Sequence, residues 1–166
     1  QGQSMGLERM VGDFLDMAKI EAGQLDVQLH REDLRNVVRE VVGLIEDPSR
    51  HDRLVLRLPP APVFVQCDAV RMEQVVTNLI SNALKYSPAH EPVEVELVVD
   101  GGDALICVKD RGAGISEEEQ RVVFEPFRRS PRTTATVPGL GLGLFVVQRI
   151  VDAHGGHIEV KSAPGR

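Results

Sequence analysis

A chain of 166 residues is long enough for one well-cored domain with a short appendage. Its 42% hydrophobic and 27% charged residues are typical of a soluble globular protein. The net charge of −6 argues against nucleic acid as a partner, because counterion release requires a basic face. A membrane-spanning helix needs about 18 consecutive apolar residues, and the sequence has no such run. We therefore expect a cytoplasmic chain without a nucleic-acid partner.

Apolar residues near the start recur in steps of three and four, at Leu7, Met10, Phe14 and Met17. This spacing predicts a helix that packs against other helices, with Gly23 as its stop. A single amphipathic helix cannot bury its own apolar face, so this one requires partners from elsewhere. We therefore divide the chain into a helix at residues 1–24 and a second domain at residues 25–166.

From residue 25 onward, strand-like and helix-like patterns follow one another. Alternation predicts strands at 25–29, 53–58, 93–100, 104–110 and 157–162. The helical period predicts helices at 32–47, 68–85, 117–124 and 141–154. The segment DGGD between the third and fourth strands predicts a hairpin turn. These elements indicate an α+β sandwich, with helices on one face of a largely antiparallel sheet.

The cysteines and histidines show no pattern of a metal site. Cys67 and Cys107 lie far apart, each in or beside an apolar run, and we interpret them as buried free thiols in a reducing compartment. The histidines lie at the ends of expected elements, where surface or capping positions are the simplest interpretation: His30, His51, His90, His154 and His157.

The helix expected at 68–85 carries two asparagines one turn apart, although Asn is a poor helix-interior residue. Its apolar face belongs to the core, and its opposite stripe consists of Arg71, Gln74, Asn78, Asn82 and Lys85. A merely solvated stripe is the alternative, but it would favour Glu, Lys or Arg over Asn. Carboxamide oxygens suit Mg²⁺, and Lys85 adds a point charge for phosphate.

Two glycine-rich segments support a phosphate ligand. DRGAG, residues 110–114, follows an expected strand, and its glycines would let a flat ligand approach the backbone. GLGLGL, residues 139–144, begins a helix, where free N–H groups and the helix dipole favour an anion. Neither segment is specific alone, because the first could be an ordinary turn and the second lacks the spacing of a P-loop.

Order and spacing make the combined signal specific. NLISNALKY, DRGAG, VFEPFRR and GLGLGL together resemble the N box, first glycine box, F box and second glycine box of the GHKL ATP-binding fold, in its sensor histidine kinase branch. The resemblance covers residues 25–162. LERMVGDFLDMAKIEAGQL also resembles the second helix of a histidine kinase dimerisation and phosphotransfer domain. The resemblance implies a Bergerat-type two-layer α/β sandwich that binds ATP and Mg²⁺ under a mobile lid at residues 128–138.

The resemblance also implies residue roles. Asn82 and Asn78 would bind Mg²⁺, and Asp110 would accept a hydrogen bond from the adenine amino group. Catalytic roles fall to Asn78, Lys85 and Arg129, the last reaching toward the γ-phosphate. The remaining implied nucleotide contacts are Lys85, Tyr86, Gly112, Gly114, Ile115, Phe124, Phe127, Gly139, Gly141, Leu142 and Gly143. Phe124 and Phe127 would hinge the lid, with core packing as the alternative.

Two departures from the family pattern suggest a piece of a longer kinase. The family's phosphoacceptor His lies on a helix preceding this stretch, and the family continues into one more strand after SAPGR. The resemblance therefore implies a homodimeric parent, whose membrane anchoring the sequence leaves open. Its partners would be ATP, the dimerisation and phosphotransfer domain, and a response regulator.

Three other functions remain open at this point. A GHKL ATPase shares the nucleotide site but carries a water-activating Glu one turn before the metal-binding Asn. Here that position is Asn78, and a carboxamide takes no proton at neutral pH. Serine-directed kinases share the same nucleotide fold. A noncatalytic dimerisation or signalling module is the third alternative, and the intact boxes argue against it.

Overall fold

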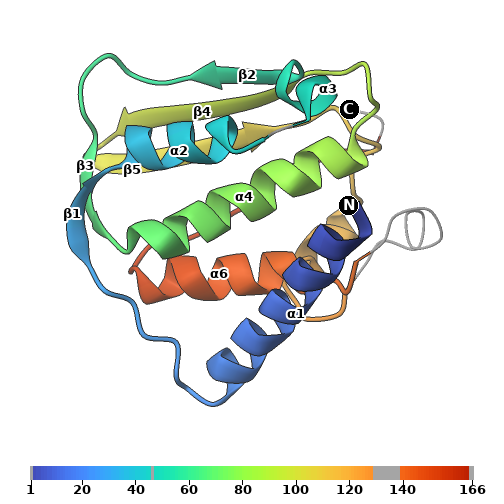
Figure 1. Ribbon diagram of the computed structural model, residues 1–166, viewed down its shortest axis with the longest axis horizontal. Coiled ribbons are helices and arrows are strands. Elements are labelled where there is room, and N and C mark those ends of the chain that lie inside the picture. The colour runs from blue at the N-terminus through green and yellow to red at the C-terminus, as the bar shows by residue number, and fades with distance from the viewer. Residues whose placement is uncertain (1, 46, 129–138, 165–166) are drawn as a thin grey trace.

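A computed structural model describes residues 2–45, 47–128 and 139–164, with side chains from residue 11 onward (Figure 1). The helices are α1 Gly2–Glu21, α2 Leu34–Gly43, α3 Pro48–His51, α4 Ala69–Tyr86, α5 Glu117–Val122 and α6 Gly143–Ala153. The strands are β1 His30–Asp33, β2 Leu54–Arg57, β3 Phe64–Cys67, β4 Val93–Asp100 and β5 Asp103–Lys109. Within this described part, no helix combines the length and apolarity that crossing a membrane requires.

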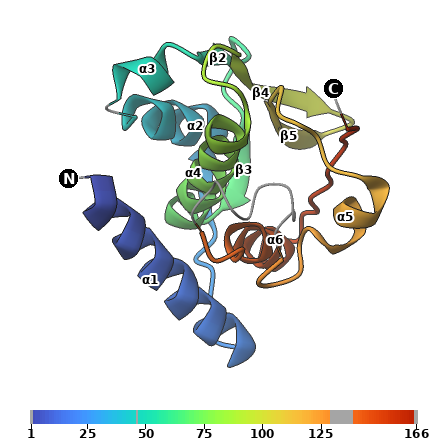
Figure 2. The same ribbon diagram turned by 90° about the vertical axis from the view of Figure 1, so that its right-hand side faces the viewer.

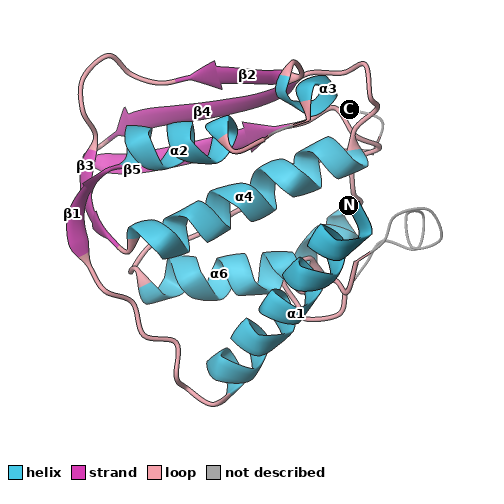
Figure 3. Ribbon diagram, viewed as in Figure 1, coloured by secondary structure: helices cyan, strands magenta, loops and turns pink. Residues whose placement is uncertain are grey.

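The strands form two short sheets (Figure 3). β1 pairs with β3 in antiparallel register, with His30 opposite Cys67. β4 is the central strand of the other sheet, parallel to β2 and antiparallel to β5. Gly101 and Gly102 turn the β4–β5 hairpin, and both have positive φ angles, 59° and 95°, which glycine adopts without strain. The predicted hairpin and the predicted fold class are confirmed.

Helices α2, α4 and α6 cover one face of the sheets (Figures 1 and 2). Their buried residues recur with the helical period, so each helix turns one apolar face to the core. On α4 the buried apolar residues are Met72, Val75, Val76, Ile80 and Ala83, as its pattern predicts. On α6 they are Phe145, Val146, Val147 and Ile150. Burying one such aliphatic side chain contributes roughly 1.5–3 kcal/mol, so hydrophobic packing holds the helix layer on the sheets.

The structure corrects two predicted strands. Residues 25–29 form a linker without strand pairing, because the ladder begins only where β3 supplies a partner for His30. Residues 157–162 keep the alternating exposure but form no ladder. Ile158 packs against the core, while Ser162 hydrogen-bonds to Ile115 and Gln120 instead of to a strand. The sequence does not predict β3, whose four residues follow directly on a proline-rich stretch.

Helix α1 lies outside the helix layer and packs against α6 (Figures 1 and 2). Gly23, with a φ of 67°, donates its N–H to the carbonyl of Ile20, so the predicted helix stop is confirmed. Met17 and Ile20 face the core cluster and pack against it. The other side of α1 is open, since Val11, Phe14 and Leu15 are each more than half exposed.

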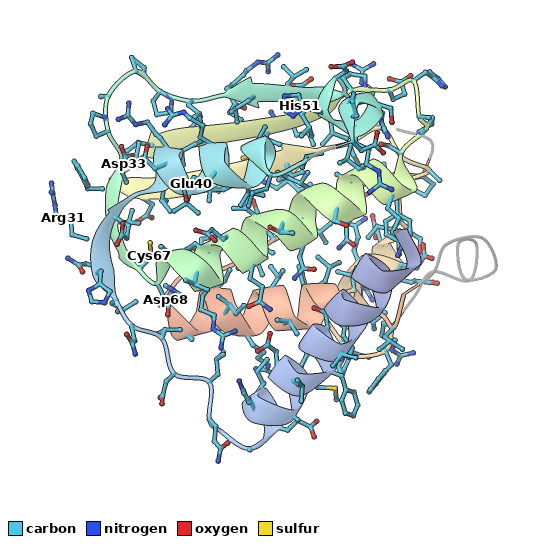
Figure 4. All side chains as sticks on the ribbon, in the orientation of Figure 1. Arg31, Asp33, Glu40, His51, Cys67 and Asp68 are labelled. Atoms are coloured by element: carbon cyan, nitrogen blue, oxygen red, sulfur yellow. The ribbon has the colours of Figure 1, made fainter. Side chains whose placement is uncertain are left out.

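Asp33 fixes the junction between β1 and α2 (Figure 4). Its Oδ1 accepts the backbone N–H groups of Arg35 at 3.1 Å and of Val63 at 3.0 Å. Its Oδ2 lies 2.8 Å from Nη2 of Arg35. The Arg35 guanidinium, helped by the two N–H groups and opposed by burial, holds the pKa of Asp33 well below its usual range.

We expect the stabilisation from Asp33 to disappear in acid. Because the folded-state pKa lies below the ordinary value of 3.8, this stabilisation is fully present above that value and is lost as pH falls through the folded pKa. Asp33→Asn should therefore lower the free energy of unfolding at neutral pH, by a deficit that begins to shrink only below about pH 3.8 and keeps shrinking as pH falls toward the folded pKa. Urea unfolding across this range measures the difference, with Asp100→Asn in the exposed hairpin turn as the control. A deficit in Asp33→Asn that stays constant with pH would contradict the assignment.

Candidate nucleotide site

The polar stripe of α4 meets the first turn of α6 at Asn78. The Asn78 side chain is buried, with 6% of the residue exposed, in a helix whose other buried residues are apolar. A β-carbon at Gly143 would lie 3.2 Å from Asn78 Oδ1, tighter than nearly all real contacts of that kind. The missing side chain at Gly143 therefore lets the start of α6 come up against the carboxamide. The structure thus brings together two segments that the sequence separates by 65 residues.

The second glycine segment also lies against Lys85. A β-carbon at Gly139 would lie 2.9 Å from Nζ of Lys85, and the φ of Gly139 is 147°. Lys85 Nζ lies 5.2 Å from the ring centroid of Tyr86, which is 37% exposed. The ammonium group, the aromatic ring and the glycine backbone therefore share one end of α4, as the sequence predicts for a phosphate site.

The N-terminus of α6 is available to an anion. Its N-cap residue is Leu142, and among the described residues no side chain makes a capping hydrogen bond there. The φ of Gly141 is 73°, a backbone conformation that glycine adopts readily. The uncapped N–H groups of the first turn and the helix dipole together favour negative charge. Leu142 itself is 1% exposed, so only its backbone can face a ligand.

The first glycine segment packs against the end of α4. Asp110 Oδ1 accepts the N–H of Gly112 at 2.7 Å, which fixes the turn. A β-carbon at Gly112 would lie 2.9 Å from the carbonyl oxygen of Tyr86. Only glycine permits this approach, so Asp110 is held beside the helix that carries Lys85. The carboxylate has a second oxygen with which to accept a hydrogen bond from a ligand amine.

Gly114 and Ile115 pack against the C-terminal segment of the described chain. Gly114 has a φ of 69°, and a β-carbon there would overlap the carbonyl of Ala163. The N–H of Ile115 donates to Ser162 Oγ at 3.0 Å. The structure therefore gives both residues a packing role that the sequence does not indicate.

The F box joins the second glycine segment through Phe127. The N–H of Phe127 donates to the carbonyl of Gly141 at 3.0 Å, and Phe127 has a φ of 62°, which is unusual for a side chain of this size. Phe127 is 55% exposed, so simple core packing does not account for it, whereas Phe124 is half-buried. Arg129 and the predicted lid beyond it lie outside the described residues.

The polar stripe of α4 has two different uses along its length. Arg71 Nη1 lies 3.1 Å from Asp16 Oδ1 of α1, and Gln74 Nε2 donates to Asp16 Oδ2 at 2.6 Å. The first half of the stripe thus holds α1. In the second half, Asn78 and Lys85 lie against the second glycine segment, and Asn82 between them in sequence is half-buried. The sequence places all these residues on one face but gives no signal that Asp16 pairs with two of them.

Backbone N–H groups also stabilise the carboxylate of Asp68, the N-cap residue of α4 (Figure 4). Burial opposes ionisation of Asp68, but the N–H groups of Gln28 and Arg71 and the charge of Arg71 prevail and keep its pKa below the usual range. The N–H of Asp68 donates to Nε2 of His154, which follows α6, so the expected capping position of this histidine is confirmed. Cys67 and Cys107 are free, and burial raises the pKa of Cys67 to about 11. Cys67 is therefore a protonated core thiol at neutral pH and a poor nucleophile.

The donor set at the end of α4 fits a metal-bound nucleotide. Asn82 lies one turn beyond Asn78 and is more exposed, so its carboxamide oxygen is the better placed of the two for a hard cation. Lys85 and the uncapped turn of α6 can neutralise phosphate charge. Asp110, at the start of the first glycine segment, supplies a hydrogen-bond acceptor.

Comparison with known proteins identifies relatives of the chain. Residues 67–166 match the family model described as histidine kinase-, DNA gyrase B- and HSP90-like ATPase. The chain is 35% identical over 167 residues to the virulence sensor protein BvgS of Bordetella bronchiseptica, covering 96% of this chain and 14% of BvgS. It is 34% identical over 173 residues to the sensor histidine kinase WalK of Bacillus subtilis, covering all of this chain and 28% of WalK. The chain thus spans a minor part of these curated relatives.

Solved structures of similar fold include the histidine kinase AdeS and full-length ShkA. The Acinetobacter baumannii histidine kinase AdeS matches with a TM-score of 0.75 and 32% identity, over 99% of this chain and 76% of that chain. Full-length ShkA in complex with AMPPNP matches with a TM-score of 0.78 and 27% identity, over 96% of this chain and 34% of that chain. The similarity to AdeS includes α1 as well as the helix and sheet layers, because nearly the whole chain is covered.

We expect Asn82→Ala to abolish the Mg²⁺-dependent part of nucleotide affinity, because it removes the carboxamide best placed for the metal. Calorimetric titration with ATP, with and without Mg²⁺, measures this part as the ratio of the two dissociation constants. The loss should be about tenfold or more, since even outer contacts of a metal site reach that size. Thr77→Ala, at an exposed position on the same helix, is the matched control. An unchanged dissociation constant for ATP with Mg²⁺ would remove Asn82 from the site.

Proposed function

Because the chain belongs to the family of histidine kinase-, DNA gyrase B- and HSP90-like ATPases, we propose that it is the catalytic domain of a sensor histidine kinase. In this proposal it holds ATP with Mg²⁺ and donates the γ-phosphoryl group to a His on another part of the kinase. Residues 25–166 form the nucleotide-binding domain, and residues 1–24 are the second helix of the dimerisation and phosphotransfer domain.

One observation carries this proposal, namely the convergence of α4 and α6. Asn78 and Lys85 of α4 lie against Gly143 and Gly139, at the uncapped start of α6. Phosphoryl transfer asks the protein mainly for positioning and charge neutralisation rather than for covalent chemistry. Positioning and charge neutralisation around a phosphate chain can come from a lysine, two carboxamides and a helix N-terminus.

Each part of the site has a proposed task. Asn82, with help from Asn78, would orient the metal, which when bound neutralises charge on the phosphates. Lys85 would hold a phosphate oxygen, and Asp110 would accept the adenine amino group. Transfer forms a phosphorus–nitrogen bond on the acceptor imidazole and breaks the bond from the γ-phosphorus to its bridging oxygen, which leaves with ADP. The imidazole nitrogen that attacks must be unprotonated and keeps the phosphoryl group.

Asn78 favours transfer to a protein over rapid hydrolysis. A water-activating base is required to turn this site into an efficient ATPase, and a carboxamide cannot accept a proton at neutral pH. Asn78 is also buried against Gly143 of α6. BvgS and WalK are named as a sensor protein and a sensor histidine kinase, which agrees with this preference.

The open face of α1 supports a proposal about assembly. Val11, Phe14 and Leu15 are more than half exposed, while Met17 and Ile20 on the same helix pack against the domain core. Such a face requires apolar partners, as the helices of a dimeric bundle would provide. We propose that the parent kinase is a homodimer that passes its phosphoryl group on to a response regulator.

A transfer assay separates a kinase from an ATPase. With Mg²⁺ and ATP labelled at the γ-phosphate, this chain alone should neither label itself on His nor hydrolyse ATP quickly. A dimerisation domain with an intact acceptor His, added as a separate chain, should become labelled with an acid-labile, alkali-stable phosphoryl group. Transfer should be inefficient, because separate chains lose the effective concentration that a covalent link provides.

The controls of this assay use the same two chains. The acceptor domain with His→Ala should stay unlabelled, and Asn82→Ala in the donor should abolish labelling of the intact acceptor. Rapid ATP turnover by this chain alone, at a rate that an added acceptor domain does not change, would contradict the kinase proposal and favour an ATPase.

A further inference from the structure

Arg53, immediately before β2, donates to four oxygen atoms at 3.2 Å or less, in the last turn of α4 and in the segment that follows it. Its Nε donates to the carbonyl of Glu91 at 2.9 Å, and its Nη1 donates to the carbonyl of Leu84 at 3.2 Å. Its Nη2 donates to Ser87 Oγ at 2.7 Å and to the carbonyl of Pro88 at 2.8 Å. All three guanidinium nitrogens are thus engaged with residues 84–91, more than 30 positions away in the sequence.

These bonds hold the C-terminal end of α4. The last carbonyls of a helix lack intrahelical partners and carry the negative end of its dipole, so a cation there is favourable. Ser87, the C-cap residue, is 8% exposed, and its hydroxyl donates to the carbonyl of Ala83 at 2.7 Å while it accepts from Arg53. The backbone of Arg53 is fixed as well, because its carbonyl accepts the N–H of Val93 at the start of β4. The end of α4 is therefore tied to the sheet through one guanidinium group.

The held segment touches both parts of the candidate site. Lys85 and Tyr86 lie between the contacts that Arg53 makes to Leu84 and Ser87. The carbonyl oxygen of Tyr86 is the atom that a β-carbon at Gly112 would approach to 2.9 Å. The carboxylate of Glu91, whose carbonyl Arg53 binds, lies 3.7 Å from Nη1 of Arg111 in the same glycine segment.

We propose that Arg53 is a positioning residue of the nucleotide site, which sets the phosphate-facing end of α4 in register with the loop that carries Asp110. Arg53 touches neither nucleotide nor metal in this account and acts through Ser87, Glu91 and the backbone of Tyr86. The inference rests on the proposed nucleotide-binding function and adds to it a residue outside the four sequence boxes. A shift of this helix end would move Lys85 and Asp110 relative to each other, and so would weaken binding of one ligand that needs both.

The guanidinium geometry is required, because a lysine at this position would keep the charge but lose the planar fork. Arg53→Lys can reach one or two of the four oxygens and leaves the others to water or without a partner. The matched control is Arg57→Lys at the end of β2, where the guanidinium pairs with Glu94 at 2.7 Å and is more than half exposed. Ser87→Ala is a milder second variant, which removes one acceptor of Arg53 and leaves the remaining carbonyls in place.

The experiment measures ATP affinity in the presence of Mg²⁺, well below the melting temperature of each variant. We expect Arg53→Lys to bind about tenfold more weakly, a loss of the size that charge-assisted hydrogen bonds account for, and Ser87→Ala about threefold more weakly. Arg57→Lys should bind as the parent chain does. Amide spectra provide a readout that general destabilisation does not move. In nucleotide-free protein, the Gly112 resonance should shift in Arg53→Lys and stay in place in Arg57→Lys.

The outcomes separate this inference from the proposed function. If the parent chain binds no ATP, the nucleotide-binding function itself fails, whatever the variants do. If the parent binds ATP and both Arg53→Lys and Ser87→Ala bind equally well, Arg53 has no positioning role. Equal weakening by Arg53→Lys and Arg57→Lys would also overturn the inference, because the effect would then follow from loss of any arginine in or beside β2. Should Arg53→Lys not fold, Ser87→Ala and its Gly112 resonance decide the question alone.

Discussion

The close approach of α4 and α6 at Asn78 and Gly143 is the constraint on which the site depends. A buried carboxamide needs hydrogen-bonding partners, and the missing side chain at position 143 lets α6 come close to it without a tight contact. This contact aims the uncapped start of α6 at the polar stripe of α4. The backbone that we propose to bind phosphate thereby comes up against the polar stripe that we propose to bind the metal, although neither segment forms a site alone.

The rest of the molecule keeps that pair of helices in place. Hydrophobic burial on α2, α4 and α6 holds the helix layer against the sheets, and Arg53 ties the end of α4 to β2. At the other end of α4, Asp68 binds both the linker, through Gln28, and the end of α6, through His154. The same helix also contacts α1, through Asp16, which pairs with Arg71 and accepts a hydrogen bond from Gln74.

The sequence predicts the elements of this arrangement better than their contacts. The apolar period of α4, the DGGD hairpin and the Gly23 stop are local patterns, and each is confirmed. The strand expected at 157–162 is wrong because alternation reports only which side chains face the core, whereas a ladder also requires an available partner strand. The glycines of the candidate site are predicted from the two glycine boxes of the sequence. The pairing of Asp16 with Arg71, and the four contacts of Arg53, are long-range and carry no local signal.

The central claim is that α4 and the start of α6 bind the nucleotide jointly. A crystal structure of this chain with AMPPNP and Mn²⁺, in which anomalous scattering locates the metal, tests it most directly. We predict the phosphates between Lys85 and the N–H groups at the start of α6, with the metal beside the Asn82 carboxamide. A nucleotide bound elsewhere, for example in the groove between α1 and α4 that Asp13 and Thr77 line, would contradict the account.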